Sequence, residues 1–326
     1  MDGTNDRETA AGGGEGLVIR AAAGTCDVAA GGRTWRCDLR GRLKKGPREV
    51  QTPVVAGDRV RFSVVDASAD PPTGVVEDVG ERRTRVSRMA ARRTGGRVEQ
   101  VLMANLDQVV AVQSLRAPAP QTGFVDRVLV AAERFGVGGV VVLNKVDLAG
   151  PEDDLDRWSY FAALGCTVLQ TSVKDGRGLD GLRAVLAGRI SLLVGASGVG
   201  KSSLLNAVDP GLGLKVGRVA DKTGLGRHTT TRTELFPVAG GGWIADSPGM
   251  RGFDPWDVEP EELRDYFPDF AAAADACRFR TCLHRDEPDC GVKRAVATGA
   301  LPVWRHEAYL ALLRDLEDRR DRLAPR

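Results

Sequence analysis

Residues 195–202 read GASGVGKS, which has the G-x-x-x-x-G-K-S spacing of a phosphate-binding loop, or P-loop. An apolar run, SLLV, precedes this segment, and a stretch of helical character, 202–208, follows it. Glycines here let backbone N–H groups curl round a β-phosphate, and the helix N-terminus adds a favourable dipole. We expect Lys201 to reach the β- and γ-phosphates and the Ser202 hydroxyl to bind Mg²⁺. The predicted nucleotide contacts are Gly195, Ala196, Ser197, Gly198, Val199, Gly200, Lys201, Ser202 and Ser203.

A second motif concerns the base. Asn144, Lys145, Val146 and Asp147 form the pattern N-K-x-D at the end of the apolar run VVVLN. A carboxylate in the plane of guanine accepts hydrogen bonds from N1–H and the exocyclic amine, and adenine has no such pair of donors. Asp147 therefore predicts binding of GTP and GDP but not ATP, with Lys145 over the ring. The triplet TSV around Ser172 looks like the companion loop that meets guanine O6 with a backbone N–H.

A third motif, DSPG at 246–249, follows the apolar run WIA and has the D-x-P-G form of a γ-phosphate sensor. We expect Asp246 to hold Mg²⁺ through water and the Gly249 N–H to meet the γ-phosphate. The preceding segment GRHTTT, 226–231, supplies the switch threonine on Mg²⁺. Thr229 and Thr230 are equally good candidates for that role.

Met250 stands where many GTPases place the glutamine that orients the attacking water. A thioether cannot orient water, so slow intrinsic hydrolysis is expected, with completion by another group or a partner. His228 is a candidate for that group because imidazole can position or accept from water. A solvated loop residue is an equally good interpretation of His228.

The motifs run in an unusual order. Ordinary small GTPases present the P-loop first and N-K-x-D near the end, whereas here N-K-x-D and the O6 loop come before the P-loop. Circular permutation keeps such a site while moving the chain ends, which is tolerated when the ends lie close at the surface. The sequence therefore predicts a circularly permuted GTPase domain.

Four potential metal ligands lie within fourteen residues. Cys277, Cys282, His284 and Cys290 give the spacing C-x₄-C-x-H-x₅-C. Three thiolates and one imidazole complete a tetrahedral zinc site with no open position, so we expect one structural zinc ion per chain. A chance group of reduced thiols is the alternative.

Seven arginines and one acid occupy the stretch 81–97, ERRTRVSRMAARRTGGR. Arginine pairs bidentately with phosphate, and a loop-like, accessible run of this kind could bind RNA. A solvated linker is the competing interpretation. We favour RNA because the preceding residues suggest a small barrel of a type that binds nucleic acid.

The elements that carry these motifs fall into three groups. Short apolar alternations at 17–22, 34–39, 58–65, 74–79 and 84–88 predict a five-stranded barrel of the OB or SH3-like type. Apolar runs at 109–115, 140–144 and 191–195 alternate with helical stretches at 124–135, 155–164 and 179–187, which predicts a parallel α/β sheet. The chain ends in a charged helix, 303–323, with an apolar side formed by Tyr309, Leu310, Leu312 and Leu313.

Composition is compatible with this division. The chain has 326 residues, 42% of them hydrophobic and 28% charged, with a net charge of +2, which suits a protein of two or three domains. Residues 1–15 are glycine-rich without an apolar stretch, so a disordered tail is expected rather than a signal peptide. No run of eighteen apolar residues occurs, so we expect a cytoplasmic protein without a membrane span. We also expect a monomer. The predicted domains are 16–98, 99–255 and 256–326.

Together these features resemble the RsgA (YjeQ) family of small-subunit-dependent GTPases. The resemblance covers nearly all of residues 16–320 and is carried by NKVDL (144–148), GASGVGKSSLLNA (195–207), GRHTTT (226–231), DSPGMRGF (246–253), FPDF (267–270) and HRDEPDCGVKRAV (284–296). It implies an OB-fold N-terminal domain and a C-terminal zinc domain. It also implies GTP hydrolysis stimulated by the small ribosomal subunit and a role in late maturation of that subunit. Ser247, where threonine is usual, and the N-terminal tail are departures that leave the nucleotide site intact.

Two other functions are compatible with parts of the sequence. One is a nucleotide-gated RNA-binding module in which hydrolysis is incidental. The other is a permuted GTPase of large-subunit assembly, and a barrel at the N-terminus with a Cys/His cluster at the C-terminus argues against it.

Overall fold

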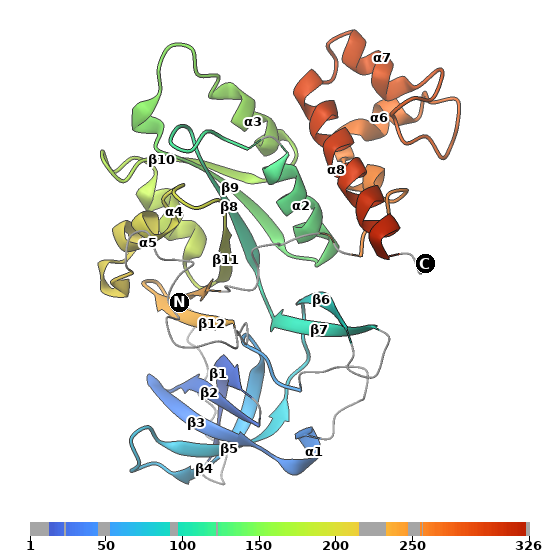
Figure 1. The fold of residues 1–326 in the computed structure, drawn as a ribbon. Coiled ribbons are helices and arrows are strands. Elements are labelled where there is room, and N and C mark those ends of the chain that lie inside the picture. The colour runs from blue at the N-terminus through green and yellow to red at the C-terminus, as the bar shows by residue number, and fades with distance from the viewer. Residues whose placement is uncertain are drawn as a thin grey trace. The chain divides into compact units, whose positions relative to one another are not determined.

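The computed structural model describes residues 13–22, 24–44, 53–91, 97–121, 123–214, 233–246, 255 and 257–323. The chain divides into two compact units, each of which is described by itself (Figure 1). The first unit comprises residues 1–108, 179–193 and 201–252, and the second comprises residues 109–178, 194–200 and 253–326.

The first unit begins with a closed barrel. Its strands are β1 (Gly13–Ala22), β2 (Thr25–Ala30), β3 (Arg33–Leu39), β4 (Arg59–Asp66) and β5 (Thr73–Val79). Strand β1 pairs antiparallel with both β2 and β4, β4 pairs antiparallel with β5, and β3 pairs parallel with β5. The sheet therefore closes in the order β1-β2-β3-β5-β4, which confirms the predicted OB-like barrel. Short α1 (Gly41–Lys44) follows β3.

Alternation of side chains builds the barrel interior. Val18, Val28, Phe62 and Val76 are buried, and residues beside them in the same strands are more exposed. Strand β2 was not among the predicted strands, because its six residues, TCDVAA, carry only a weak apolar alternation. Its pairing with β1 and β3, which a local pattern does not show, makes it a strand.

The segment predicted as the fifth barrel strand lies elsewhere. It belongs to β6 (Arg85–Ala91), which pairs antiparallel with β7 (Arg97–Ala104) in a separate two-stranded sheet. This pairing also corrects the prediction that the arginine-rich stretch is loop-like, since its described part from Arg85 onward is extended. The partner strand lies beyond the stretch, so the local composition did not reveal it.

The described residues in the rest of the first unit include three more strands and two helices, and the first of these strands ends with one residue of the second unit, Val194. Strand β11 (Ile190–Val194) pairs parallel with β13 (Gly242–Asp246), and β12 (Glu234–Val238) pairs antiparallel with β13. Strand β12 also meets the barrel, where Glu234 lies opposite Arg20 of β1. Helices α4 (Leu179–Leu186) and α5 (Lys201–Val208) and the 3₁₀ helix η2 (Pro210–Leu212) complete this part.

The second unit begins with the strands β8 (Gln108–Ser114), β9 (Gly138–Asn144) and β10 (Thr167–Thr171), which lie in the order β10-β9-β8, with β9 and β10 parallel. Every residue of β8 is buried, as expected for a strand covered on both faces. Helices α2 (Phe124–Arg134) and α3 (Asp156–Ala163) and the 3₁₀ helix η1 (Val146–Leu148) connect these strands. The alternation of strands and helices confirms the predicted α/β class.

Short elements pack around the last helix of the chain. They are η4 (Leu263–Tyr266), η5 (Pro268–Phe270), α6 (Ala271–Ala274) and α7 (Gly291–Ala297), and the last helix is α8 (Val303–Leu323). Of the predicted apolar side of α8, Tyr309, Leu312 and Leu313 are buried in this core, whereas Leu310 is half-buried. No helix of the described residues is long and apolar enough to cross a membrane.

A buried arginine anchors α8 to α2. Arg305 is 3% exposed and forms ion pairs with Asp126 of α2 and with Asp269 of η5. Tyr160 of α3 donates a hydrogen bond of 2.8 Å to Asp269 Oδ2. Burial lowers the pKa of Arg305 to about 9, which still leaves it protonated at neutral pH. The C-terminal elements are thus joined to α2 and α3 by a charge cluster withdrawn from water.

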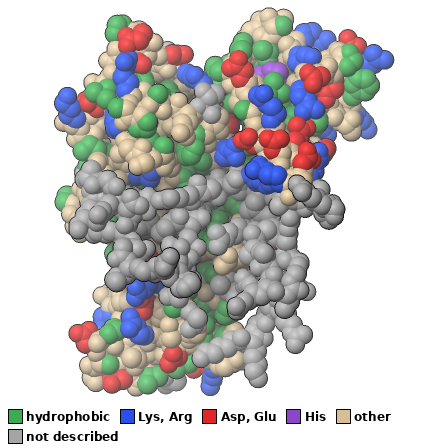
Figure 2. Space-filling model, in the orientation of Figure 1, with side chains coloured by type: hydrophobic (Ala, Val, Ile, Leu, Met, Phe, Trp, Pro, Cys, Tyr) green, Lys and Arg blue, Asp and Glu red, His purple; other side chains and the backbone are tan. Residues whose placement is uncertain are grey.

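Ion pairs also cover the outside of these C-terminal elements. Figure 2 shows Lys/Arg and Asp/Glu side chains interspersed there rather than gathered by sign. Arg285 pairs with Glu317, and Arg320 pairs with Glu261. Exposed pairs of this kind contribute little to stability, so the buried cluster around Arg305 dominates the polar attachment.

Candidate functional site: a guanine-nucleotide site and a Cys/His metal centre

The P-loop glycines are required by close backbone approaches. A Cβ atom on Gly195 would lie 2.3 Å from the carbonyl oxygen of Val112 in β8. Gly200 has φ of +100°, and a Cβ atom there would lie 2.3 Å from Asn144 Nδ2. Both positions exclude a side chain, which explains why glycine occupies the first and sixth positions of the motif.

Helix α5 begins at Lys201, directly after the loop. Burial lowers the pKa of the Lys201 ammonium, and a bound phosphate would favour its charged form again. Ser202, the predicted Mg²⁺ ligand, is 7% exposed and occupies the next position of the helix. Ser203 follows it and is half-buried.

Asn144 connects the base-recognition loop to the P-loop. Its side-chain Nδ2 donates a hydrogen bond of 2.9 Å to the carbonyl oxygen of Val199. Its Oδ1 accepts a bond of 3.1 Å from the Thr171 hydroxyl. Asn144 is 2% exposed, so its role is to hold three loops together rather than to meet solvent.

Lys145 adds a second connection. Its backbone is in the left-handed region, with φ of +62°, and its Nζ donates to the carbonyl oxygens of Gly198, at 2.7 Å, and Ala117. The side chain is therefore drawn toward the P-loop. Its expected position over a guanine ring stays a prediction.

Asp147 is held by the loop predicted to meet O6. The Ser172 hydroxyl donates a bond of 2.8 Å to Asp147 Oδ1. The same hydroxyl accepts from the backbone N–H groups of Lys174, at 3.2 Å, and Asp175, at 3.3 Å. These contacts orient the carboxylate before any base arrives. Val146, 2% exposed, lies in the apolar core cluster that includes Val141 and Leu143.

Several predicted site residues lie outside the described residues. They are His228, Thr229, Thr230, Gly249 and Met250. Asp246 is the last residue of β13, the strand predicted to end in the γ-phosphate sensor. Their roles at the γ-phosphate remain predictions.

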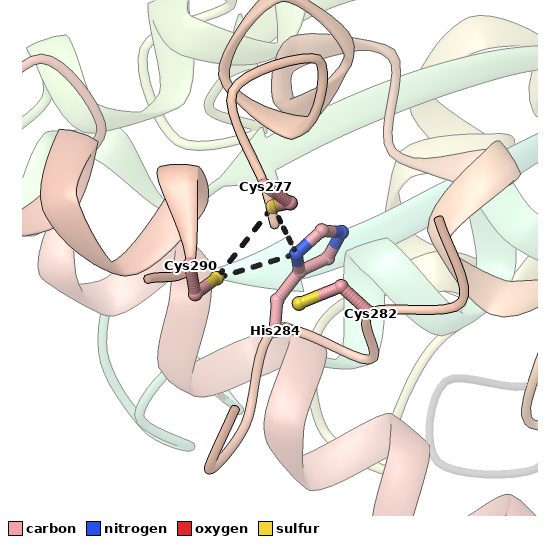
Figure 3. A group of neighbouring side chains, drawn as sticks. All are labelled: Cys277, Cys282, His284 and Cys290. Atoms are coloured by element: carbon pink, nitrogen blue, oxygen red, sulfur yellow. Dashed lines mark hydrogen bonds between the residues drawn. The ribbon is translucent and has the colours of Figure 1, made fainter. Parts of the chain in front are cut away.

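The four predicted metal ligands converge (Figure 3). Their ligand atoms all lie within 4.8 Å of one another. His284 Nδ1 lies 3.6 Å from Cys277 Sγ and 3.5 Å from Cys290 Sγ, and the two sulfur atoms are 3.9 Å apart. Ligands in a tetrahedron around zinc, with Zn–S of about 2.3 Å, lie roughly 3.5–3.8 Å apart. The three separations among Cys277, His284 and Cys290, 3.5–3.9 Å, are close to these values, and Cys282 lies within the wider limit of 4.8 Å.

Backbone N–H groups at two of the three thiols, Cys277 and Cys290, support the same chemistry, whereas the surroundings of Cys282 favour its neutral form. Burial raises the pKa of Cys282 to about 12. Burial also acts to raise the pKa of Cys277, but backbone N–H groups of Gly291 and Val292 bring it below its ordinary value. The N–H of Gly291 donates to Cys277 Sγ at 3.2 Å, and that of Lys293 donates to Cys290 Sγ at 3.5 Å. Such N–H groups stabilise thiolates, the form in which cysteine binds metal.

The described arginines of the basic stretch have different environments. Arg82 makes two hydrogen bonds of 2.8 Å to Asp58, which is 0% exposed, so Arg82 is a structural residue and a poor candidate for RNA. Arg83 and Arg85 have side chains 66% and 65% exposed, and they pair with Asp107 and Glu99. Arg92 and Arg93 lie outside the described residues.

Sequence reasoning missed the residues that hold the motifs in place. The sequence placed Thr171 in the predicted O6 loop. It gave no sign that the Thr171 hydroxyl donates a hydrogen bond to Asn144. Gly57, Asn105 and Asp107, which connect the barrel to β11, lie in no motif. A positive φ at Asn105 is a conformation that asparagine tolerates, but an isolated asparagine gives no signal in a sequence.

Family models match most of the chain. Residues 79–256 match the model described as RsgA GTPase, and residues 15–69 match the RsgA N-terminal domain. The small ribosomal subunit biogenesis GTPase RsgA of Moorella thermoacetica is 39% identical over 302 residues, covering 93% of this chain and 97% of that protein. The protein of the same name from Gemmatimonas aurantiaca is 38% identical over 306 residues, covering 93% and 98%.

Solved structures agree in fold. The crystal structure of YjeQ from Thermotoga maritima has a TM-score of 0.68 and 32% identity, covering 96% of this chain and all of that one. YloQ, described as a circularly permuted GTPase, also has a TM-score of 0.68, with 28% identity and full coverage of both chains. The permuted order of the motifs is thereby confirmed, and the chain belongs to the RsgA GTPase family.

Proposed function

We propose that this protein binds the small ribosomal subunit and acts in its late maturation, hydrolysing GTP to GDP and phosphate at a rate that the subunit raises. The observation that carries the proposal is the prearranged Asp147 carboxylate, held by Ser172 and joined through Asn144 to the P-loop. Relatives named small ribosomal subunit biogenesis GTPase, at 38–39% identity, support the choice of partner.

The residues divide the chemistry between base and phosphates. Asp147 accepts from the two guanine donors, and a base that lacks them would leave this carboxylate unpaired. Lys201 neutralises charge on the phosphoryl group in transfer. Ser202, Asp246 through water, and Thr229 or Thr230 would hold Mg²⁺, which would neutralise negative charge on the phosphates.

Completion of the catalytic site belongs to the proposal as well. Met250 cannot orient water, so the water-positioning group comes from elsewhere, with His228 as the candidate in this chain. Hydrolysis by the protein alone is then slow because no glutamine orients the attacking water. The subunit accelerates it by completing or ordering this region.

The Cys277, Cys282, His284 and Cys290 cluster binds one zinc ion in this proposal. Four protein ligands leave no open position, so the zinc stabilises the C-terminal fold and takes no part in hydrolysis. Helices α6 and α7 have only four and seven residues, and a metal crosslink stabilises short elements of this kind.

The remaining parts of the proposal concern organisation. Residues 99–255 and 256–326 act as the GTPase and zinc domains. The barrel before them is formed by strands that span residues 13–79, which corrects the predicted bounds of 16–98 for the barrel and 1–15 for the tail. The barrel and the exposed arginines beside it contact ribosomal RNA. The protein works as a monomer in the cytoplasm, where GTP and ribosomal subunits meet.

The deciding experiment is a multiple-turnover GTPase assay with purified small subunits and, separately, large subunits. The proposal expects strong stimulation by small subunits only. Cosedimentation should show tighter binding of the GTP form than the GDP form, because a nucleotide switch acts through differential affinity. Equal stimulation by both subunits, or by neither, would contradict the assignment to the small subunit. Full GTP-dependent binding without stimulated hydrolysis would favour a nucleotide-gated RNA-binding module instead.

A further inference from the structure

The barrel touches the last residue of β7, Ala104, at a point with no room for a side chain. Gly57 has φ of +90°, and a Cβ atom there would lie 1.9 Å from the carbonyl oxygen of Ala104. The N–H of Ala104 donates to the carbonyl oxygen of Ala56 at 3.0 Å. Backbone therefore lies directly against backbone at this contact, and any sliding would break it.

Asn105 fixes this contact from the other side. It is 3% exposed, and its backbone has φ of +52°. Its Nδ2 donates to the carbonyl oxygen of Gly57 at 2.9 Å, and its Oδ1 accepts from the N–H of Arg83 at 2.8 Å. One side chain thus ties the barrel to the segment that precedes β6.

Asp107, two residues further, holds the strand that leads into the P-loop. Its Oδ2 accepts from the N–H of Ile190 at 2.8 Å, and its own N–H donates to the carbonyl oxygen of Ile190 at 2.9 Å. Its Oδ1 accepts from Arg83 Nη2 at 3.0 Å. Asp107 therefore forms hydrogen bonds with both backbone polar groups of Ile190, the first residue of β11.

These contacts form a continuous polar joint from the barrel to β11. Its members are Gly57, Arg83, Asn105, Asp107 and Ile190. Strand β11 ends at Val194, directly before the P-loop residue Gly195. A barrel displaced by a bound partner would pull on Asn105 and Asp107, and through them on the strand that positions the loop. The Asn105–Gly57 bond is buried and the Arg83–Asp107 bond is exposed, and a continuous set of such bonds transmits a displacement that a flexible linker would absorb.

We propose that Asn105 and Asp107 are positioning residues that couple the barrel to the P-loop strand, so that contact of the small subunit with the barrel raises the GTPase rate. Neither residue belongs to a nucleotide motif or touches a predicted nucleotide contact. The inference rests on the proposed function, because it concerns the stimulated rate and not the intrinsic one.

Variants that cut the joint with little strain test the proposal. Asn105→Gly keeps the left-handed backbone but removes both side-chain bonds. Asp107→Asn keeps an acceptor for Ile190 N–H but loses the charge that pairs with Arg83, and Arg83→Gln removes that pair from the other end. The expected result is a roughly two- to thirtyfold lower maximal stimulation by small subunits. The intrinsic rate, GDP affinity and the subunit concentration for half-maximal stimulation should stay near those of the parent protein.

Matched controls separate coupling from general damage. Arg61→Gln removes an exposed barrel ion pair with Asp78, outside the joint. Gln108→Leu removes the bonds of 2.8 Å from Gln108 Nε2 to Val185 O and to Ser191 Oγ of β11, and the bond of 2.9 Å that Gln108 Oε1 accepts from Arg189 Nη1. None of these bonds reaches the barrel. Both controls should keep the parent stimulation. The double variant Arg83→Gln/Asp107→Asn should lose no more stimulation than either single variant, since both cut the same link.

Three results would contradict either the coupling role of the joint or the proposed function on which it rests. Joint variants that are stimulated as strongly as the parent would overturn the coupling role. If the intrinsic and the stimulated GTPase rates of the joint variants fall by the same factor, the joint is only a stabilising contact. That result would overturn the coupling role as well. A parent protein that small subunits do not stimulate would instead contradict the proposed function on which the inference rests.

Discussion

The Ser172 hydroxyl donates a hydrogen bond of 2.8 Å to Asp147 Oδ1, joining two loops whose residues are 25 positions apart. The carboxylate predicted to recognise the base is therefore oriented in the protein without nucleotide. Because preorganised groups lose less freedom on binding, this contact should contribute to the affinity for guanine nucleotides.

Replacing Asp147 by asparagine should change the preferred base from guanine to xanthine. The new amide offers a donor to the C2 oxygen of xanthine, and it loses the charged acceptor for guanine. A hydrogen bond to a charged group contributes about 1.5–3 kcal/mol, so GDP affinity should fall at least roughly tenfold while xanthosine diphosphate binding rises. Calorimetric titration of both nucleotides measures this. Ser172→Ala should weaken GDP binding to a smaller extent without a gain for xanthine, and unchanged GDP affinity in Asp147→Asn would refute the base assignment.

Lys201→Ala should abolish most hydrolysis. The variant lacks the positive charge at the transferring phosphoryl group, and removing one such stabilising group lowers rates by about 10²–10³-fold. The measurement is phosphate release in the presence of small subunits, with Lys174→Ala, an exposed lysine near the base loop, as the control. Turnover of Lys201→Ala at the parent rate would remove the P-loop assignment.

One zinc ion per chain is expected from elemental analysis of protein purified without chelator. Cys282→Ala should release the metal and unfold the elements around α6 and α7, while GDP binding persists. Cys166→Ala, at a half-buried cysteine outside the cluster, should keep the metal. A parent protein that contains no zinc would contradict this prediction.

Arg305→Met should destabilise the second unit strongly. The change leaves Asp126 and Asp269 buried without their cationic partner, and breaking a buried pair in this way costs about 3–5 kcal/mol. Arg127→Ala, which removes an ion pair with the half-exposed Asp315, should cost about 0–1 kcal/mol. Denaturant unfolding followed by tryptophan fluorescence reports on both, because Trp304 packs against Tyr160. Equal stabilities of the two variants would mean that the cluster does not anchor α8.

The arginine-rich stretch should control the salt dependence of subunit binding. Replacing Arg92 and Arg93 by alanine should lower the slope of log affinity against log salt by about 0.7 for each phosphate that is no longer neutralised. Arg82 is excluded from this test because its replacement would leave Asp58 buried and unpaired. Cosedimentation at a series of salt concentrations measures the slope, and an unchanged slope would show that these two arginines do not contact RNA.

Short spacings in the sequence predicted the chemistry of the site. Asn144, Asp147, the P-loop glycines and the Cys277–Cys290 set were all identified from patterns of a few residues. Such patterns can be recognised in a sequence because a phosphate, a base or a metal ion requires particular side chains at particular separations along the chain. Local periodicity also predicted the parallel strands and the helices between them. Helix α8 spans the predicted residues 303–323.

Contacts between distant residues decided what the sequence could not show. The pairing of β1 with β4 closes the barrel, the pairing of β6 with β7 takes the predicted fifth strand out of it, and Arg82 is drawn to Asp58, 24 residues away. Arg305 and Asp126 are separated by 179 residues. An arginine in a basic run and an arginine in a charged helix look alike in sequence, because only folding determines which of them loses water and gains a buried carboxylate. The burial of a charge is a property of the tertiary structure, since it depends on every element packed around that charge.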